Sequence, residues 1–173
     1  DVTDKDAVAN LVRETRSDLI INCIGVLIKG SKDHPDNAIF INAYFPHLLK
    51  KLADEVGAKL IHVSTDCVFS GKKGNYNESD FRDADDIYGR SKALGEIIND
   101  KDLTIRTSII GPELKLNGEG LFHWFMHQKG KVNGFTTAIW GGVTTLELAK
   151  AMDVAIVQQK TGLIQLSNGK GIT

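Results

Sequence analysis

The chain has 173 residues, of which 42% are hydrophobic and 25% are charged, a makeup typical of a folded domain and not of a disordered segment. Its formal net charge is -1, so charge gives no reason to expect nucleic acid or an anionic membrane as a partner. No apolar stretch approaches the ~20 residues that span a bilayer, and the first residues lack the pattern of a signal peptide. We therefore expect a cytoplasmic protein with no membrane partner.

The first part of the chain alternates between helical and strand patterns. Apolar residues at helical spacing follow a predicted N-cap at Thr3, and the unbroken apolar run over 19–21 predicts a strand buried on both faces. A second helical pattern covers 37–56, with Pro46 expected to bend it. The run over 59–64 predicts the next strand, and a loop rich in turn-forming residues follows it.

The alternation continues with a helix predicted over 87–99 and a strand predicted over 103–107. Strands separated by helices run parallel and are joined by right-handed crossovers, so we expect an α/β fold with a doubly wound parallel sheet of Rossmann type. The rhythm changes beyond Pro112, where an aromatic helix is predicted over 121–128 and Thr144 begins a capping box. We therefore divide the chain at residue 112.

The cysteines and histidines do not form a recognisable metal pattern. Cys23 and Cys67 lie far apart without C-x-x-C spacing, so we expect two free thiols. His123 and His127 could place two imidazoles on one helical face, but the glutamate of an H-E-x-x-H motif is missing. His62 lies inside a strand pattern, and we interpret it as a satisfied core or sheet residue. We expect no metal site.

A Y-x-x-x-K motif, Tyr88 and Lys92, lies in a predicted helix, where residues four apart share one face. Tyrosine normally titrates near ~10, and a nearby cation that stabilises the phenolate lowers this pKa. The spacing also arises by chance, so the pair alone is a weak signal. Thr65 strengthens it, because this residue ends the strand over 59–64, and the carboxyl ends of strands face the ligand crevice of an open α/β sheet.

A further segment, 22–25, follows the first predicted strand and contains Gly25, which lets a ligand approach the backbone closely. Together with Thr65, Tyr88 and Lys92, this segment describes an oxidoreductase site. The hydroxyl of Thr65 can donate to a carbonyl oxygen of the substrate, and a tyrosine with a tuned pKa can act as an acid or a base.

Two longer motifs are the most specific, Ser-Thr-Asp-x-Val-Phe-x-Gly at 64–71 and Tyr-Gly-x-Ser-Lys-x-x-Gly-Glu at 88–96. With the segments 1–4, 22–25 and 106–108, they resemble the extended short-chain dehydrogenase/reductases, and within these the dTDP-4-dehydrorhamnose reductases and their sugar-nucleotide relatives. The resemblance covers most of the chain. It implies that residues 1–112 are a partial dinucleotide-binding domain and that residues 113–173 are a partial substrate-binding region.

The resemblance also implies roles in the reduction of a sugar 4-keto group. Tyr88 would protonate the alkoxide formed as hydride reaches the carbon, and Thr65 would hydrogen-bond the same oxygen. Lys92 would hold the nicotinamide ribose and tune Tyr88. Asn42 is similar to an asparagine that supports this lysine through water in the family, although a helix-surface amide or a satisfied core amide is the alternative interpretation.

The cofactor implied is NADPH or NADH, and the partner is a nucleotide-sugar substrate. Cys67 and Ile109 depart from the tyrosine and tryptophan common in rhamnose-type enzymes, which leaves another 4-keto sugar open as the substrate. By the resemblance the cofactor contacts are Asp1, Val2, Cys23, Ile24, Gly25, Ser64, Tyr88 and Lys92. The substrate contacts are Asp66, Cys67, Ser108 and Ile109.

The family begins with a strand and a Gly-x-x-Gly-x-x-Gly turn whose helix takes the pyrophosphate, and this chain lacks that turn. We therefore expect a fragment with an incomplete sheet that is inactive on its own. The family makes a homodimer plausible. Two alternatives stay open: epimerisation or dehydration of a sugar nucleotide, and a regulatory subunit that binds a dinucleotide without turnover, resembling the β subunit of methionine adenosyltransferase.

Overall fold

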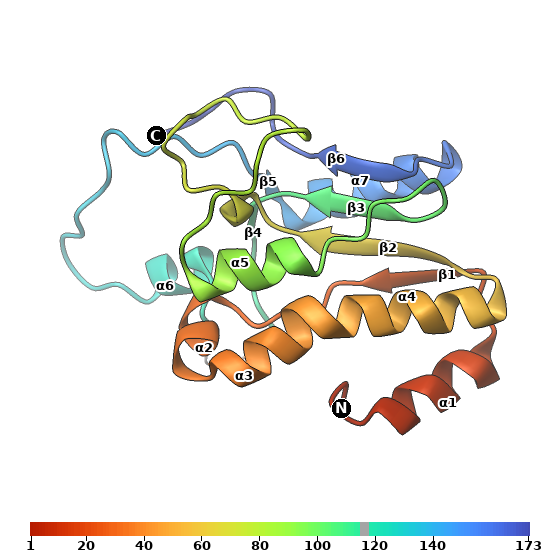
Figure 1. Cartoon of the computed structure of the whole chain (residues 1–173). Coiled ribbons are helices and arrows are strands. Elements are labelled where there is room, and N and C mark those ends of the chain that lie inside the picture. The colour runs from red at the N-terminus through yellow and green to blue at the C-terminus, as the bar shows by residue number, and fades with distance from the viewer. Residues whose placement is uncertain (115–117) are drawn as a thin grey trace. The chain divides into compact units, whose positions relative to one another are not determined.

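A computed structural model describes residues 1–114 and 118–173 of the chain. The described residues form two compact units (Figure 1). The first comprises residues 1–106 with 161–165, and the second comprises residues 107–160 with 166–173. Residues 115–117 of the predicted substrate-binding region lie outside the described residues. The division predicted at residue 112 concerns function, and it stays a prediction.

The first unit is built on a parallel sheet with the strand order β1-β2-β3-β6. Its strands are β1 (Leu19–Asn22), β2 (Lys59–Ser64), β3 (Leu103–Arg106) and β6 (Gly162–Gln165). All three neighbouring pairs run parallel, and β2 and β3 are almost wholly buried, as expected for a sheet covered on its faces. The predicted parallel α/β sheet of Rossmann type is therefore confirmed.

The helix that begins the chain is α1 (Lys5–Thr15). Its N-cap is Asp4, whose carboxylate accepts a hydrogen bond from the Ala7 amide at 2.9 Å, so the prediction of Thr3 as the cap is wrong by one residue. Thr3 instead donates to the side chain of Asp1. Aspartate and threonine are both good caps, and the pattern alone did not choose between neighbours.

The helical stretch predicted over 37–56 is divided into separate segments. It consists of α3 (Pro35–Ala38), a π-helix η1 (Ile39–Tyr44) and α4 (Phe45–Val56), and α2 (Ile28–Asp33) precedes it. Pro46 has no N–H to donate to the carbonyl of Asn42, four residues earlier. The backbone bonds widen just before it, and the Phe45 amide donates to Phe40, five residues back. Pro46 is thus the second residue of α4, which follows the π-helix.

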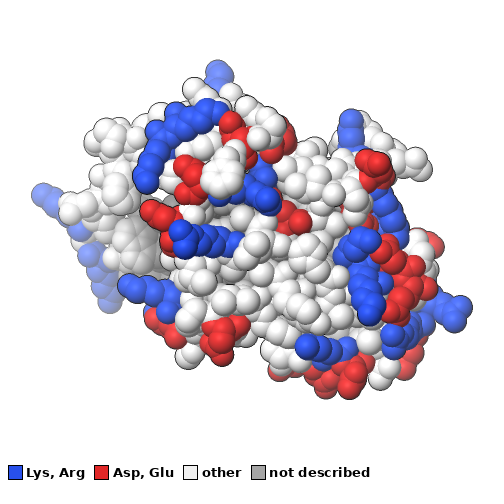
Figure 2. Space-filling view, viewed as in Figure 1, with Lys and Arg blue, Asp and Glu red and all other residues white. Residues whose placement is uncertain are grey.

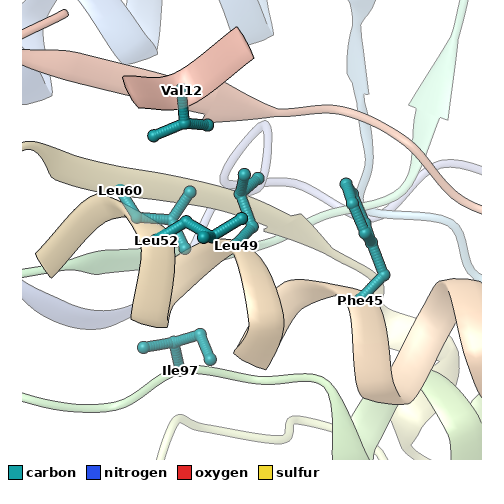
Figure 3. Packing of buried hydrophobic residues seen from close by; sticks show 6 residues of the cluster. All are labelled: Val12, Phe45, Leu49, Leu52, Leu60 and Ile97. Atoms are coloured by element: carbon teal, nitrogen blue, oxygen red, sulfur yellow. The ribbon is translucent and has the colours of Figure 1, made fainter. Parts of the chain in front are cut away.

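A hydrophobic core joins α1, α4 and β2 on one face of the sheet (Figure 3). Burying these side chains is the main favourable term for this unit. The core fixes α4 on β2, and it includes a residue of the segment after α5 (Ile87–Leu94). Its buried members are Val12, Phe45, Leu49, Leu52, Leu60 and Ile97.

Gly95 ends α5 where this helix meets η1 most closely. A Cβ atom added at Gly95 would lie 1.9 Å from the carbonyl oxygen of Asn42 and 3.2 Å from the ring of Pro46. The backbone of Gly95 does not have a positive φ, so its requirement for glycine comes from packing alone. The helix predicted to reach residue 99 ends at Leu94, so its predicted end is wrong.

We expect Gly95→Ala to lower the free energy of unfolding by about 2 kcal/mol or more, because the clash is with backbone and cannot be relieved by a side-chain rotation. Urea denaturation measures this change. Gly134→Ala is the matched control, since a Cβ there meets no atom within 4 Å. Equal effects of the two substitutions would contradict the close packing of α5 on η1.

The second unit contains the parallel pair β4 (Ile109–Ile110) and β5 (Val143–Thr144), with α6 (Leu121–Met126) and α7 (Thr145–Val157). The hydroxyl of Thr144 accepts from the Glu147 amide at 3.1 Å, which confirms the predicted start of the last helix. The indole of Trp140 donates to the Ser108 hydroxyl at 2.7 Å. None of the residues of α6 is buried.

The distribution of surface charge, the lengths of the helices and the grouping of metal-binding side chains are relevant to the partners expected from the sequence. Figure 2 shows basic and acidic side chains interspersed over the visible face, without a continuous patch of one sign. Within the described ranges, no helix is long and apolar enough to cross a membrane. The same residues contain no group of histidine, cysteine, aspartate or glutamate side chains that could hold a metal ion.

Candidate active site

The carboxyl end of β2 meets the helix α5. Thr65 follows β2 directly, and its hydroxyl accepts from the Cys67 amide at 3.1 Å, which begins the short 3-10 helix η2 (Asp66–Val68). Asp86 caps α5 by accepting from the Gly89 amide at 2.9 Å. Gly89 lies so close to η2 that an added Cβ would be 2.3 Å from the Cys67 carbonyl oxygen. A glycine one residue after Tyr88 therefore lets α5 lie against the segment that contains Thr65.

The structure brings Thr65 and Tyr88 together. Burial raises the pKa of Tyr88 to about 12, and the charges of Asp66 and Asp86 act in the same direction, whereas a hydrogen bond with Thr65 lowers it. Burial of the phenol is the largest of these causes in the protein alone. The phenol is consequently protonated at neutral pH, which is the state of a proton donor. The lowering expected from Lys92 together with an oxidised nicotinamide ring stays a prediction.

Lys92 lies one helical turn after Tyr88, and it is almost wholly buried, with 5% of its surface exposed. Its ammonium donates to the carbonyl of Val63 in β2 at 2.7 Å, which ties α5 to the sheet. Burial lowers the pKa of Lys92 to about 8, and the charge of Glu96 raises it. An ammonium has three donors, so this side chain can bind further acceptors beside Val63.

The turn 23–25 follows β1, at the same edge of the sheet as Thr65. A Cβ added at Gly25 would lie 3.8 Å from the Lys92 ammonium nitrogen and 3.4 Å from Oδ1 of Asn42. The turn, the lysine and the asparagine are therefore neighbours. Burial raises the pKa of the Cys23 thiol, and the charge of Lys92 lowers it.

Asn42 is fully buried in η1 and joins the turn to α5. Its side chain accepts from the Val26 amide at 2.8 Å, and it donates to the Val26 carbonyl at 3.0 Å and to the Ser91 hydroxyl at 3.2 Å. The side chain is thus a satisfied buried amide. Its support of Lys92 through water stays a prediction.

A buried ionic network that we did not predict from the sequence lies behind the site. Arg106 donates to both carboxylate oxygens of Glu96, at 2.7 and 2.9 Å. Ser64 donates to the same carboxylate at 2.9 Å, and Arg82 donates to it at 3.0 Å. The hydroxyl of Ser64, a predicted cofactor contact, is therefore bonded to Glu96. Glu96 and Arg106 both belong to stretches that carried the family resemblance, but their pairing had no sequence signal.

The remaining predicted contacts lie in several places. Cys23 is exposed, and Val2 is partly buried against the core near α1. Asp66 and Cys67 lie in η2, next to Thr65. Ser108 and Ile109 belong to the second unit. Both thiols, at Cys23 and Cys67, are free, as predicted.

His62 is fully buried in β2, and burial lowers its pKa to about 3, with the charges of Lys92 and His47 acting in the same direction. Its Nδ1 lies 3.1 Å from Nδ2 of Asn22. Its Nε2 has no hydrogen-bond partner among the described residues, so the interpretation of a satisfied core residue holds for one ring nitrogen only.

This histidine predicts a dependence of stability on pH. In the unfolded chain His62 binds a proton below about pH 6.5, whereas in the folded chain it stays neutral down to about pH 3. The free energy of unfolding therefore keeps its full value above pH 6.5 and falls as the pH is lowered from 6.5 to 3. Within this range the stability falls by about 1.4 kcal/mol for each pH unit. Urea denaturation between pH 7 and 4 should show a shallower decline for His62→Leu than for the wild type. Parallel declines would contradict a neutral His62.

Comparisons with known proteins agree with this fold. The chain superposes over its whole length on a dTDP-4-dehydrorhamnose reductase from Bacillus anthracis in complex with NADP, with a TM-score of 0.88 and 26% identity. A hypothetical dTDP-4-dehydrorhamnose reductase from Sulfolobus tokodaii gives a TM-score of 0.86 and 28% identity, also over the whole chain. The chain covers 64% and 63% of these two proteins. They have the same Rossmann-like α/β fold.

Sequence relatives lead to the family. A probable low-salt glycan biosynthesis reductase of Haloferax volcanii is 35% identical over 116 residues, which is 64% of this chain and 39% of the relative. A dTDP-4-dehydrorhamnose reductase of Mycolicibacterium smegmatis is 38% identical over 99 residues, 56% of this chain and 30% of the relative. The matched part thus spans less than two fifths of these relatives. The family model of the RmlD substrate binding domain matches residues 1–131, and the chain belongs to this family.

Proposed function

We propose that this chain carries part of the active site of an NAD(P)H-dependent reductase, which reduces the 4-keto group of a nucleotide-activated deoxysugar in deoxysugar or surface-polysaccharide biosynthesis. One observation carries the proposal: a protonated, buried Tyr88 lies beside Thr65 and one turn from a buried Lys92. A ketone reduction needs a proton donor at the carbonyl oxygen, and a phenol carries its proton at neutral pH. The position of this phenol beside Thr65, on the helix that also carries Lys92, is what supports the role.

Each side chain of this group has a distinct role in the proposal. Tyr88 donates its proton to the oxygen that becomes the alcohol. Thr65 donates a hydrogen bond to the same oxygen and so stabilises the charge that develops on it. Lys92, held on Val63, binds the ribose of the cofactor. Its charge also favours the phenolate left after proton transfer.

The residues present suit a nicotinamide dinucleotide, which supplies the hydride. The turn 23–25 offers backbone beside Lys92 without a side chain at Gly25, and Asn42 anchors the residue after it. We assign Cys23, Ile24, Gly25 and Ser64 to the cofactor together with Asp1 and Val2. The structure from Bacillus anthracis contains NADP, which supports NADPH as the form to test first.

We propose Asp66, Cys67, Ser108 and Ile109 as the substrate contacts. Asp66 and Cys67 lie beside Thr65, and Ser108, which accepts from Trp140, lies with Ile109 in the second unit. We propose that residues 113–173 contribute to the nucleotide-sugar site. Since the family commonly has larger aromatic residues at the positions of Cys67 and Ile109, the sugar can differ from that of rhamnose-type enzymes.

The proposal is tested by following NAD(P)H oxidation by the full-length protein against a panel of dTDP- and UDP-linked 4-keto sugars. Oxidation that depends on one sugar is the expected result, and the product should carry a hydroxyl in place of the ketone. Conversion of a sugar nucleotide without net oxidation would indicate epimerisation or dehydration instead. Dinucleotide binding with no turnover across the panel would favour a regulatory subunit.

A further inference from the structure

The side chains of His62 and Asn22 form a buried pair on neighbouring strands, directly behind the turn 23–25. They are register partners in β2 and β1, and their exposed surfaces are 0% and 2%. Nδ2 of Asn22 lies 3.1 Å from Nδ1 of His62, and Oδ1 of Asn22 accepts from the Ile24 amide at 3.1 Å. The pair thus connects the interior of the sheet to the backbone of the turn.

The hydrogen bonds fix the orientation of each group. Because the Ile24 amide is a donor, the Asn22 atom that faces it must be the oxygen, and the nitrogen of the same amide then faces His62. Nδ1 can accept a hydrogen bond from this N–H group only when Nδ1 is unprotonated, so His62 is neutral and carries its proton on Nε2. If Nδ1 carried the proton, two N–H donors would face each other, one on His62 and one on Asn22. Turning the Asn22 amide around would relieve this, but it would remove the oxygen that accepts the hydrogen bond from the Ile24 amide.

The proton on Nε2 has no acceptor among the described residues, although the ring is fully buried. A buried unsatisfied donor is unfavourable, and an apolar side chain of similar size would remove it. The ring therefore gives no evident advantage to the packing of the sheet. What it provides is an acceptor at Nδ1, at the position that orients Asn22.

We propose that His62 is a positioning residue that acts through Asn22 to hold the turn 23–25 in the conformation that receives the dinucleotide. The inference rests on the proposed function, because it concerns the turn assigned to the cofactor. Asn22 holds the turn at Ile24, and Asn42 holds its far end at Val26. Between these two anchors, Gly25 lies next to the Lys92 ammonium. Loss of one anchor leaves the turn free to move relative to Lys92.

Two substitutions distinguish the effect of the hydrogen-bond acceptor at Nδ1 from the effect of the imidazole ring. His62→Leu keeps a similar volume and removes the acceptor, whereas His62→Asn keeps an acceptor oxygen near the position of Nδ1. In His62→Leu, one unsatisfied donor on Nε2 is replaced by one on Asn22, so we expect little change in the midpoint of thermal unfolding. The two variants therefore test the orientation of the turn and not only the stability of the fold.

The first readout is hydrogen exchange of the Ile24 amide, measured by NMR on the full-length protein. We expect exchange about tenfold faster in His62→Leu and nearly unchanged in His62→Asn, because only the first variant loses the acceptor. The amide of Leu60, which donates to Asp102 in the same unit, is the internal control for general loss of stability. Equal protection of Ile24 in the two variants, relative to Leu60, would overturn the inference.

The second readout is the Kd for NADPH, measured by fluorescence titration. We expect about a tenfold increase in His62→Leu and a smaller change in His62→Asn, with kcat at saturating cofactor changed less than KM. If the wild type binds no dinucleotide, the proposed function fails, and the Ile24 readout alone then decides whether His62 positions the turn. If the wild type binds and both variants bind equally well, the positioning role is wrong while the proposed function stands.

Discussion

Replacement of Tyr88 with phenylalanine is expected to lower kcat by about 10²- to 10⁴-fold, because it removes the proton donor to the forming alkoxide. The phenol is buried and protonated beside Thr65, and it is the group proposed to donate the proton to this oxygen. The ring itself remains, so the packing of α5 and the binding of NADPH should change little. Steady-state kinetics with a saturating sugar and a separate NADPH titration measure the two effects.

A matched control for this prediction is Tyr44→Phe. Tyr44 lies in the same unit, at the end of η1, with 46% of its surface exposed, and it has no role in the proposed reaction. Its loss should leave kcat within about twofold of the wild type. Full activity of Tyr88→Phe, or an equal loss in both variants, would contradict the role of Tyr88 as the proton donor.

The largest effect on stability is expected from Glu96→Gln, which should lower the free energy of unfolding by about 3–5 kcal/mol. The side chains of Glu96 and Arg106 are 0% and 2% exposed, so the substitution leaves the Arg106 guanidinium buried without its counter-charge. Arg82 and Ser64 lose the same carboxylate. Urea denaturation monitored by circular dichroism measures the change.

The control is a surface pair of the same chemistry. Arg13 and Glu55 form an ion pair of 2.8 Å whose side chains are 53% and 35% exposed, and Glu55→Gln should cost less than about 1 kcal/mol. Adding Arg106→Met to Glu96→Gln should recover part of the lost stability, because no buried charge then remains unpaired. A loss for Glu96→Gln as small as that for Glu55→Gln would show that the buried network is not needed for the fold.

The sequence was most informative where a strand is buried on both faces. The strand over 59–64 was predicted with its observed bounds from its largely apolar residues between turn-forming segments. The run over 19–21 also forms a strand, but Ile21 is exposed, so the prediction that it is buried on both faces is wrong. The helical stretch over 37–56 was less well predicted. The spacing of its apolar residues stays close to helical through the π-helix at Ile39–Tyr44, so the sequence pattern does not reveal the widened hydrogen bonds before Pro46. β6 was missed because Gly162–Gln165 is short and half-buried.

The candidate site could be predicted in part for a similar reason. Thr65 and the turn 23–25 follow parallel strands, which places them at one edge of the sheet, and the family motif added Tyr88 and Lys92. Burial is the main cause that raises the pKa of Tyr88, and the burial of a side chain cannot be read from its neighbours along the chain. Pairs such as Glu96 with Arg106 come from the register of elements, which spacing does not reveal.

Following the transferred hydride itself distinguishes the proposed reduction from every alternative. NADPH deuterated at the transferable position of the nicotinamide should be supplied to the full-length protein with a dTDP-linked 4-keto sugar, and the product should be examined by NMR. We expect deuterium on the sugar C4 with the wild type and almost none with Tyr88→Phe over the same time. A reduced sugar without deuterium at C4, or no reduction by a wild type that binds NADPH, would contradict it.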